Sequence, residues 1–456
     1  MINKGYAKIS YIALLTCSFL AAYTLLSSLI TPTEDVNEIV IVESDTTYSP
    51  IVVAQNDKVA PKPKKKKYVK KIKRVTFDDV KGGDNFARIS TFYEALEKLE
   101  SGSIDKVRIA YFGDSITESD LCSAAFRKSL QKRFGGEGVG FVPAVSKLSK
   151  YRSSIKHTYT SNWKVYRLRK KSQRDFPLGI CGNVSKPMVP KEDSLGYVAS
   201  TICSHTYKKS AKNRLPNSTL IIKNEKEPLN ITYILDKKDT LNAVIEVKEG
   251  IQFVTLVDSM IDELTISYFP KDTCYVYGLD FSGDKGIYVD NYSIRGNKGN
   301  NFVHIKSDII ESFYEKYNYD LTILHYGANV TVPTARDYGW YRISMKKNIK
   351  YLKSIEKMSP IILFGMGDRG ALVDTLWVSS PDIPYLIKEQ KRIAKDREAG
   401  FWNILSSLGG ENINVSLREK GYLIKDHTHF SRKGAKFFGE LTYSKFMEEF
   451  KKFQGE

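Results

Sequence analysis

Two kinds of apolar pattern alternate along most of the chain. Val107–Phe112, Leu321–Tyr326 and Ile361–Phe364 are compact apolar runs typical of buried strands, and each precedes a stretch with helical spacing. The helical stripes are Leu121, Ala125, Phe126 and Leu130; Tyr341, Met345, Ile349, Leu352 and Ile355; and Phe437, Phe438, Leu441, Phe446 and Phe450. Strands alternating with helices predict an α/β domain whose parallel sheet is covered by helices on both faces.

Residues 146–285 follow a different pattern. Short β-branched segments are bounded there by Lys, Asp, Asn, Gly or Pro; they are S-T-L-I-I-K-N, L-N-I-T-Y-I-L, N-A-V-I-E-V-K, Q-F-V-T-L-V-D and E-L-T-I-S-Y-F. Such segments predict an antiparallel β-sandwich. We therefore expect a β-rich domain inserted between two parts of the α/β domain, residues 78–145 and 286–456.

The first 31 residues predict a membrane segment. Ile9 to Thr31 carries no charge and is long enough to span a bilayer. Lys4 and Lys8 precede it and acidic residues follow it, which places the rest of the chain on the extracytoplasmic or periplasmic side of the cell membrane. The prediction is a single-pass signal anchor; a cleaved signal peptide or a lipid-modified Cys17 are the alternatives.

Residues 32–77 read as a linker that ends in a basic run. The formal charge of the whole chain is +18, and residues 61–74 read P-K-P-K-K-K-K-Y-V-K-K-I-K-R. Beyond a membrane segment, such a run is an inert spacer or is attracted to anionic lipid or wall polymer, and we expect no nucleic-acid partner. The whole chain has 42% hydrophobic residues, enough to bury a substantial core.

The cysteines do not form a metal-binding pattern. None of the five is spaced as C-x-x-C, so a zinc ribbon or redox motif is not expected. Outside the cytoplasm a bridge between Cys181 and Cys203 is allowed, and buried unpaired thiols are the alternative. We expect no cofactor and no metal ion.

Ser115 is the first candidate for chemistry. The strand K-V-R-I-A-Y-F runs into G-D-S-I-T-E-S and then a helix, which places Ser115 at the carboxyl end of a parallel strand. Open α/β sheets bind their ligands at this end. A serine there can expose its hydroxyl as a nucleophile, whereas its structural alternative is to cap the helix. Asp114 is expected at the helix start.

The segment Y-L-I-K-D-H-T-H-F-S-R-K-G supplies a candidate base near the C-terminus. Asp426 and His429 are three positions apart, and in a turn this spacing lets the carboxylate orient one imidazole nitrogen while the other faces a nucleophile. His427 is the competing base. Ligation of a metal ion by Asp426, His427 and His429 is a further alternative.

Two further segments could stabilise an oxyanion. Asn329 ends the apolar run L-T-I-L-H-Y-G-A-N, where its amide could donate to an oxyanion or serve only to turn the chain. Gly296, in N-Y-S-I-R-G, would let a backbone N–H approach the same oxygen, and its alternative role is also that of a turn residue.

Together these four segments resemble the four ordered blocks of the SGNH or GDSL-type hydrolases. Ser115, Gly296, Asn329 and His429 occur in the family's order over about residues 76–145 and 286–456. The resemblance implies a flavodoxin-like three-layer α/β/α fold and a triad of Ser115, His429 and Asp426. It also implies an oxyanion hole formed by Ser115, Gly296 and Asn329. One departure is Val330, which stands where the third block usually has an acidic residue.

Three further features resemble exported bacterial carbohydrate esterases. They are the β-rich insertion and the segments F-G-G-E-G-V-G-F-V-P and F-W-N-I-L-S-S-L-G-G. The resemblance implies a serine esterase that acts on O-acyl groups, chiefly O-acetyl, of peptidoglycan or another cell-envelope polysaccharide. The alternatives are an O-acetyltransferase, which would work with a membrane acyl-transfer partner protein, and a non-catalytic glycan-binding envelope protein. Candidate sugar-stacking residues are Tyr275, Tyr277, Tyr288 and Tyr292, whose alternative role is sheet packing.

Overall fold

The computed structural model describes residues 74–188, 203–209 and 214–456, all within one compact unit. The predicted membrane segment and linker residues 32–73 lie outside these ranges. Within them, no helix is both long and apolar enough to cross a bilayer. Membrane attachment and extracytoplasmic location therefore stay predictions.

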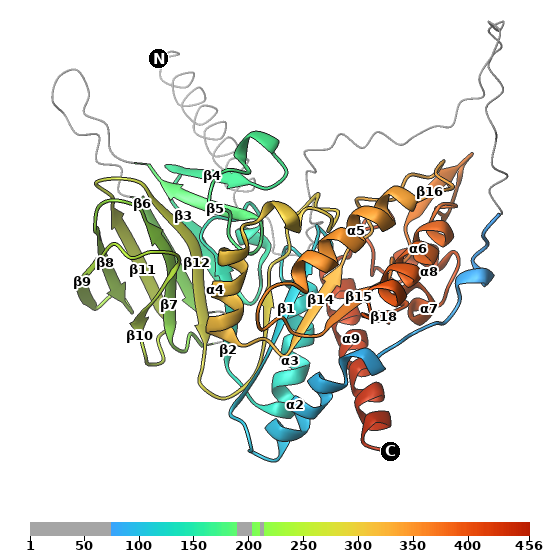
Figure 1. Cartoon of the computed structure of the whole chain (residues 1–456), viewed down its shortest axis with the longest axis horizontal. Coiled ribbons are helices and arrows are strands. Elements are labelled where there is room, and N and C mark those ends of the chain that lie inside the picture. The colour runs from blue at the N-terminus through green and yellow to red at the C-terminus, as the bar shows by residue number, and fades with distance from the viewer. Residues whose placement is uncertain (1–73, 189–202, 210–213) are drawn as a thin grey trace, which may run out of the picture. The chain divides into compact units, whose positions relative to one another are not determined.

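A five-stranded parallel sheet lies at the centre of the α/β part (Figure 1). Its strands, in the order in which they pair, are β13 (Gly286–Asn291), β1 (Lys106–Gly113), β14 (Leu321–His325), β15 (Ile361–Phe364) and β18 (Gly400–Trp402). Numbered along the chain, this is the flavodoxin-like order 2-1-3-4-5. The strand order reverses beside β1, so the carboxyl ends of β1 and β14 flank the position where such sheets bind ligands.

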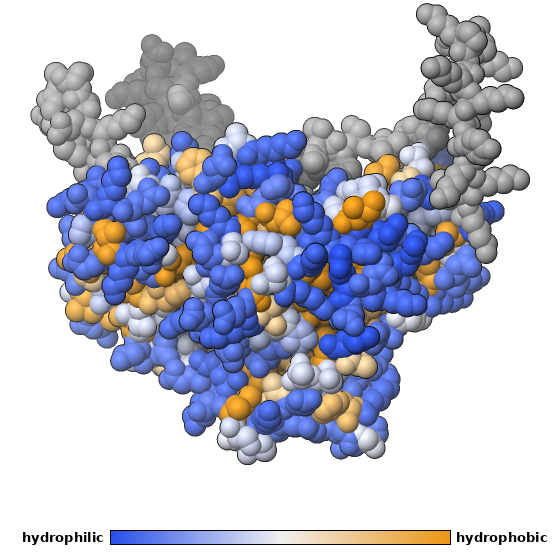
Figure 2. All heavy atoms as spheres, viewed as in Figure 1, coloured by the Kyte–Doolittle hydropathy of each residue, from blue (hydrophilic) through white to orange (hydrophobic). Residues whose placement is uncertain are grey.

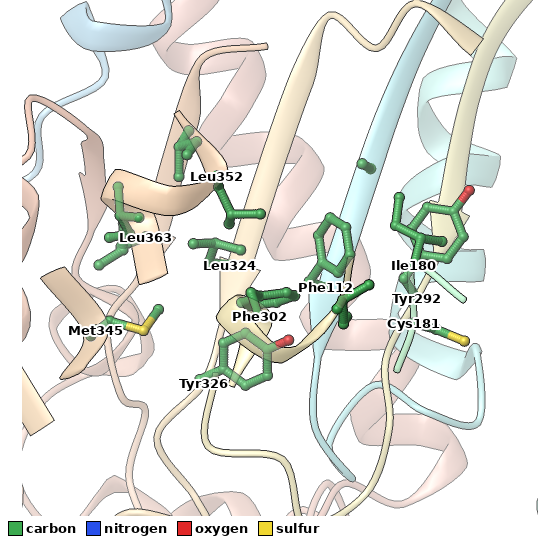
Figure 3. Close-up of a cluster of buried hydrophobic side chains, with 14 of the residues drawn as sticks. Phe112, Ile180, Cys181, Tyr292, Phe302, Leu324, Tyr326, Met345, Leu352 and Leu363 are labelled. Carbon is green, nitrogen blue, oxygen red and sulfur yellow. The ribbon is translucent and has the colours of Figure 1, made fainter. Parts of the chain in front are cut away.

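Helices cover both faces of this sheet, as the sequence predicts. One core joins the sheet to α2 (Ser90–Glu100), α3 (Leu121–Phe134) and α9 (Arg432–Phe453). The other joins it to α4 (Ser307–Tyr317), α5 (Gly339–Leu352) and α6 (Ile383–Asp396). Figure 3 shows part of the second core, where Phe112 of β1 lies between Tyr292 and Phe302. Two short helices, α7 (Ile404–Leu408) and α8 (Ile413–Glu419), precede the last helix.

Between β1 and β13 the chain forms two antiparallel sheets. One contains β10 (Gln252–Val257), β7 (Ser218–Asn224), β12 (Cys274–Ser282), β5 (Asn183–Pro187) and β4 (Trp163–Arg167), with β2 (Gly138–Pro143) also paired to β12. The other contains β3 (Ile155–Tyr159), β6 (Cys203–Lys209), β11 (Glu263–Phe269), β8 (Leu229–Leu235) and β9 (Asp239–Ile245). Apolar residues of both sheets, including Ile222 and Ile266, form a shared core, as in a β-sandwich.

The sandwich and the α/β part are packed into one structure. β2 pairs with β12 although it precedes residue 146, the predicted start of the insertion. On the outer face of the same sheet, Tyr277 packs edge-on against Phe313 of α4, in the core that covers the parallel sheet. The domain boundaries given by the sequence therefore stay a prediction.

The four tyrosines suggested for sugar stacking are buried. Tyr275, Tyr277, Tyr288 and Tyr292 expose 6%, 3%, 0% and 1% of their surface. The hydroxyls of Tyr292 and Tyr319 are 2.5 Å apart, and Tyr288 donates to the carbonyl of Lys285. The stacking interpretation is therefore wrong for these residues, and sheet packing is their role.

The face of the molecule in Figure 2 is mainly hydrophilic, with smaller areas of hydrophobic residues between.

Cys122, Cys181 and Cys274 are buried free thiols, so Cys181 does not form the bridge that the sequence allowed. Burial raises the pKa of Cys181 to about 11, which keeps its thiol protonated near neutral pH.

A buried arginine connects the parallel sheet to the sandwich. Arg108 of β1 donates from Nε to Asp290 of β13 at 2.6 Å and from Nη2 to Asp280 of β12 at 2.7 Å. The Tyr319 hydroxyl and the Phe141 N–H also donate to Asp290. Gly140 is required here, because a Cβ on it would lie 2.2 Å from Oδ1 of Asp290.

Replacing Arg108 should destabilise the protein strongly. Arg108→Met would leave two buried carboxylates without their cation, and we expect a loss of about 3–5 kcal/mol in the free energy of unfolding. Urea denaturation would measure it. The control is Arg133→Met, which removes a partly exposed pair with Glu100 and should cost less than about 1 kcal/mol. Equal losses in the two variants would contradict a special role for the Arg108 cluster.

Candidate active site

Ser115 lies in a tight turn between β1 and α3. The strand ends at Gly113, and the helix begins only at Leu121, after Asp120. Ser115 is therefore not a helix cap, and Asp114 does not lie at the helix start as expected from sequence. Asp114 instead accepts the N–H of Ile116 at 3.0 Å, which stabilises the turn. The side chain of Ser115 is left partly exposed.

The structure brings Ser115, His429 and Asp426 into one hydrogen-bonded chain. Oγ of Ser115 is 2.9 Å from Nε2 of His429, and Nδ1 of His429 is 2.6 Å from Oδ2 of Asp426. An ionised carboxylate can only accept a hydrogen bond, so Nδ1 of His429 carries the ring proton and Nε2 is left to accept the hydrogen bond of the serine hydroxyl. This is the arrangement that activates a serine nucleophile.

The loop before α9 fixes the orientation of His429. The other oxygen of Asp426, Oδ1, accepts the backbone N–H groups of Thr428 and His429 at 3.0 and 2.9 Å. Ile424 N–H donates to the carbonyl of His429 at 2.9 Å. Ser431 then caps α9 by accepting the N–H of Gly434 at 3.1 Å.

The pKa of Asp426 is lowered although its side chain is partly buried. Partial burial favours the neutral carboxyl, but the hydrogen bonds and charge of His429 outweigh it and hold the pKa below 3.8. Asp426 is therefore ionised near neutral pH and can stabilise an imidazolium on His429.

His427 faces away from the nucleophile and is part of a structural network. Its ring stacks on Trp377 of the β16–β17 hairpin (Gly370–Val373 and Leu376–Ser379), with centroids 4.2 Å apart. Its Nδ1 is 3.1 Å from Oδ1 of Asn414, whose amide donates to Asp368 at 2.8 Å. Of the two candidate bases, only His429 contacts Ser115.

The two backbone N–H groups predicted to stabilise an oxyanion are left without a protein acceptor. Those of Ser115 and Gly296 make no hydrogen bond within the described part of the chain. Gly296 has φ +69°, and a Cβ on it would lie 2.4 Å from the guanidinium of Arg169, so a larger residue would both strain the backbone and displace that arginine. Its role as an oxyanion donor stays a prediction.

Asn329 follows β14 beside this turn, and its Nδ2 donates to the carbonyl of Asn297 at 3.3 Å. The amide also favours the ionised form of Asp114 and so opposes the rise in the pKa of that carboxyl. No acidic residue follows Asn329. Arg369 instead holds the loop, donating to the carbonyl of Ala328 at 3.1 Å and to the hydroxyl of Thr331.

We predict that Asn329→Ala lowers kcat for ester hydrolysis by about 10²- to 10³-fold with little change in KM, because an oxyanion donor acts mainly in the transition state. The comparison is Asn300→Ala, which removes an amide that bonds to Ser344 instead. A kcat within a factor of about three of wild type would leave the oxyanion to backbone donors alone. A rise in KM at unchanged kcat would make Asn329 a contact of the bound substrate.

Burial raises the pKa of Asp114 from 3.8 to about 6, although the hydrogen bond from Ile116 and the charge of His429 oppose this. A raised carboxyl pKa means that the folded protein binds this proton more tightly than the unfolded chain does. Stability contributed by Asp114 is therefore lost as pH rises from about 4 to about 6.

Asp114→Asn removes this titration. The unfolding free energy of the variant minus that of the wild-type protein should increase by up to about 3 kcal/mol as the pH rises from 4 to 7. The prediction concerns this change with pH and not the size of the difference at pH 4. Urea denaturation at several pH values would show the change. A difference between the two proteins that does not vary with pH would contradict the raised pKa.

A cavity of about 400 Å³ lies beside the turn that carries Ser115, here called the catalytic turn after its predicted role, and the sequence did not reveal the cavity. Its lining includes Glu118, Ser293 and Arg295, together with basic side chains of the sandwich part, namely Lys147, Arg152, Arg167, Arg169 and Lys170. Ser115, Asp426 and His429 do not line it. The run V-Y-R-L-R-K-K was the one available signal, but these residues are brought together only by the fold.

In the described ranges, no three His, Cys, Asp or Glu side chains are grouped as a metal site would require. Asp426 and His429 are hydrogen-bonded to one another, and His427 is turned toward Trp377.

The fold is that of a known esterase. A peptidoglycan O-acetylesterase of solved structure superposes with a TM-score of 0.65 and 20% sequence identity, over 81% of this chain and 99% of that one. At this identity the match shows a shared fold, and the α/β fold that the sequence resemblance implied is confirmed. A family two carbohydrate esterase from Cellvibrio japonicus matches at a TM-score of 0.25 and 9% identity, covering 65% and 98% of the two chains, which is too remote to support any inference.

No protein-family model matches the sequence, and no curated protein matches it either.

Proposed function

We propose that this chain is an exported serine esterase that removes O-acetyl groups from cell-envelope glycans. The observation that carries the proposal is the hydrogen-bonded chain from Ser115 through His429 to Asp426, located where the strand order of the sheet reverses. The esterase fold supports the same reaction class.

The reaction proceeds in two steps. His429 accepts the proton of Ser115 at Nε2 while Oγ bonds to the acetyl carbon, and His429 then returns that proton to the sugar oxygen as the ester bond breaks. In the second step His429 takes a proton from water, whose oxygen attacks the acetyl-serine. Acetate leaves, and Ser115 regains its proton. The N–H groups of Ser115 and Gly296 and the amide of Asn329 stabilise both oxyanions.

The proposed substrate is O-acetylated peptidoglycan or a related envelope polysaccharide. Its support is the fold match to a peptidoglycan O-acetylesterase, together with the predicted membrane segment, which would hold the enzyme on the extracytoplasmic side. A sugar hydroxyl in place of water at the second step would make the same residues an O-acetyltransferase, with an acyl-transfer partner in the membrane.

Acetate release from O-acetylated peptidoglycan would test the proposal. We expect the wild-type protein to release acetate at a rate proportional to enzyme concentration, with or without an added unacetylated glycan. Acetyl groups recovered on the added glycan instead of in solution would identify a transferase. Binding of the polymer without either product would leave a glycan-binding protein and contradict the proposed reaction.

A further inference from the structure

The cavity beside the catalytic turn is continuous with the residues that form the turn. Glu118, on its wall, is three positions after Ser115 in the sequence. Ser293, also on the wall, accepts a hydrogen bond from Thr117 at 2.7 Å. Arg169 lies against Gly296, the predicted oxyanion glycine. A group bound in this cavity would therefore lie next to the reacting ester.

The charges that line the cavity are not balanced. Glu118 is neutralised by Arg295 at 2.8 Å, and Arg152 is paired with Asp120 at 3.0 Å. Arg167 acts on Glu118 through a charge interaction beyond ion-pair distance, and Arg167, Arg169 and Lys170 form no ion pair with any described residue. An excess of positive charge therefore remains on one wall.

The same wall offers a hydrogen-bond acceptor. The side-chain oxygen of Asn183 is buried and has no donor within the described ranges. A buried carbonyl oxygen without a partner is costly, and a hydroxyl or N–H of a bound molecule would satisfy it. The cavity, at about 400 Å³, is in the size range of small-molecule sites.

We propose that this cavity binds a carboxylate carried by the substrate, on the glycan itself or on a peptide attached to it, and so selects acidic glycans. The inference rests on the proposed esterase function and specifies its substrate. Guanidinium groups suit this ligand because they donate two parallel hydrogen bonds to a carboxylate. Arg167 and Arg169 would hold the carboxylate, and Asn183 would accept from a neighbouring hydroxyl or amide.

The kinetic test compares charged and neutral forms of one substrate. O-acetylated peptidoglycan fragments are used as such and after their carboxylates have been converted to amides. We expect wild-type kcat/KM to be at least tenfold higher on the charged fragments. In the double variant Arg167→Gln, Arg169→Gln this preference should fall to less than twofold, mainly through a higher KM for the charged form.

The matched control is Lys156→Gln. Lys156 is an exposed cation on β3 that does not line the cavity, and its loss should leave the preference unchanged. Two further substrates distinguish the two sources, because an amidase that removes the peptide also frees a carboxylate on the glycan. A preference for the charged form of fragments that keep their peptide assigns the carboxylate to the peptide, and a preference seen only with the peptide-free strands assigns it to the glycan. An equal fall on charged and amidated fragments in the double variant would overturn the proposal.

Direct binding separates this proposal from the esterase function. De-O-acetylated fragments, which cannot react, are titrated calorimetrically against the wild-type protein and the double variant. Tighter binding of the charged than the amidated form, lost in the double variant, supports the cavity even if no acetate is released in the assay above. Equal binding of both forms by the wild-type protein would overturn it, even if acetate release is confirmed.

Discussion

Ser115→Ala is expected to lower kcat for acetate-ester hydrolysis by about 10⁴-fold or more, because the variant lacks the atom that attacks the acyl carbon. The hydroxyl lies 2.9 Å from Nε2 of His429 on a turn that other residues stabilise. Asp114 and Thr117 make the hydrogen bonds of that turn, so removing Oγ should leave the fold intact. Hydrolysis of a chromogenic acetate ester measures the effect.

The control for this variant is its thermal unfolding, which should match that of the wild-type protein. A fluorophosphonate probe should label the wild-type protein at Ser115 and fail to label the variant. Turnover near the wild-type rate by a folded Ser115→Ala protein would move the reaction to another site.

His429→Ala is expected to lower kcat by several orders of magnitude, since it removes the group that accepts the serine proton. His427→Ala offers a matched comparison in the same loop. His427 contacts Trp377 and Asn414 and not Ser115, so its loss should reduce stability more than kcat. Steady-state kinetics and urea denaturation of both variants separate the two effects.

The reverse ranking of kcat would make His427 the base. Comparable losses in both variants, restored by added zinc, would favour metal ligation by Asp426, His427 and His429 instead of proton transfer.

The arrangement of the α/β part could be predicted because its signals are local. Compact apolar runs such as Val107–Phe112 form strands that are buried on both faces, and the stripe from Tyr341 to Leu352 lies on one side of α5. Ser115 follows one strand, and Asn329 follows the neighbouring strand. Because parallel strands end at the same edge, the fold brings both close to the loop of His429.

Strand ends in the sandwich were less predictable. The segment N-A-V-I-E-V-K covers 242–248, whereas β9 runs from Asp239 to Ile245. Its register is set by the hairpin with β8, in which Leu235 is opposite Asp239 and Leu229 is opposite Ile245. The position of the turn between the two strands therefore makes polar residues part of the edge strand β9. Hydrophobicity alone would not assign these residues to a strand.

Burial of amphipathic side chains and contacts between distant segments also lie beyond the sequence pattern. A tyrosine suits a core as well as a sugar-binding surface, and Tyr275 and Tyr292 are core residues. The basic cavity joins Arg167 and Arg169 of the sandwich part to Arg295, which follows β13. No local pattern marks residues so far apart as neighbours.

Identification of the acetylated residue is the most direct test of the proposed mechanism. Wild-type protein is mixed with an acetate ester, quenched in acid within the first turnover and digested, and the peptides are examined by mass spectrometry. We predict an acetyl group on Ser115 that disappears when the substrate is exhausted. Turnover with no acetyl group on Ser115, or with the acetyl group on another side chain, would contradict an acyl-serine mechanism at this site.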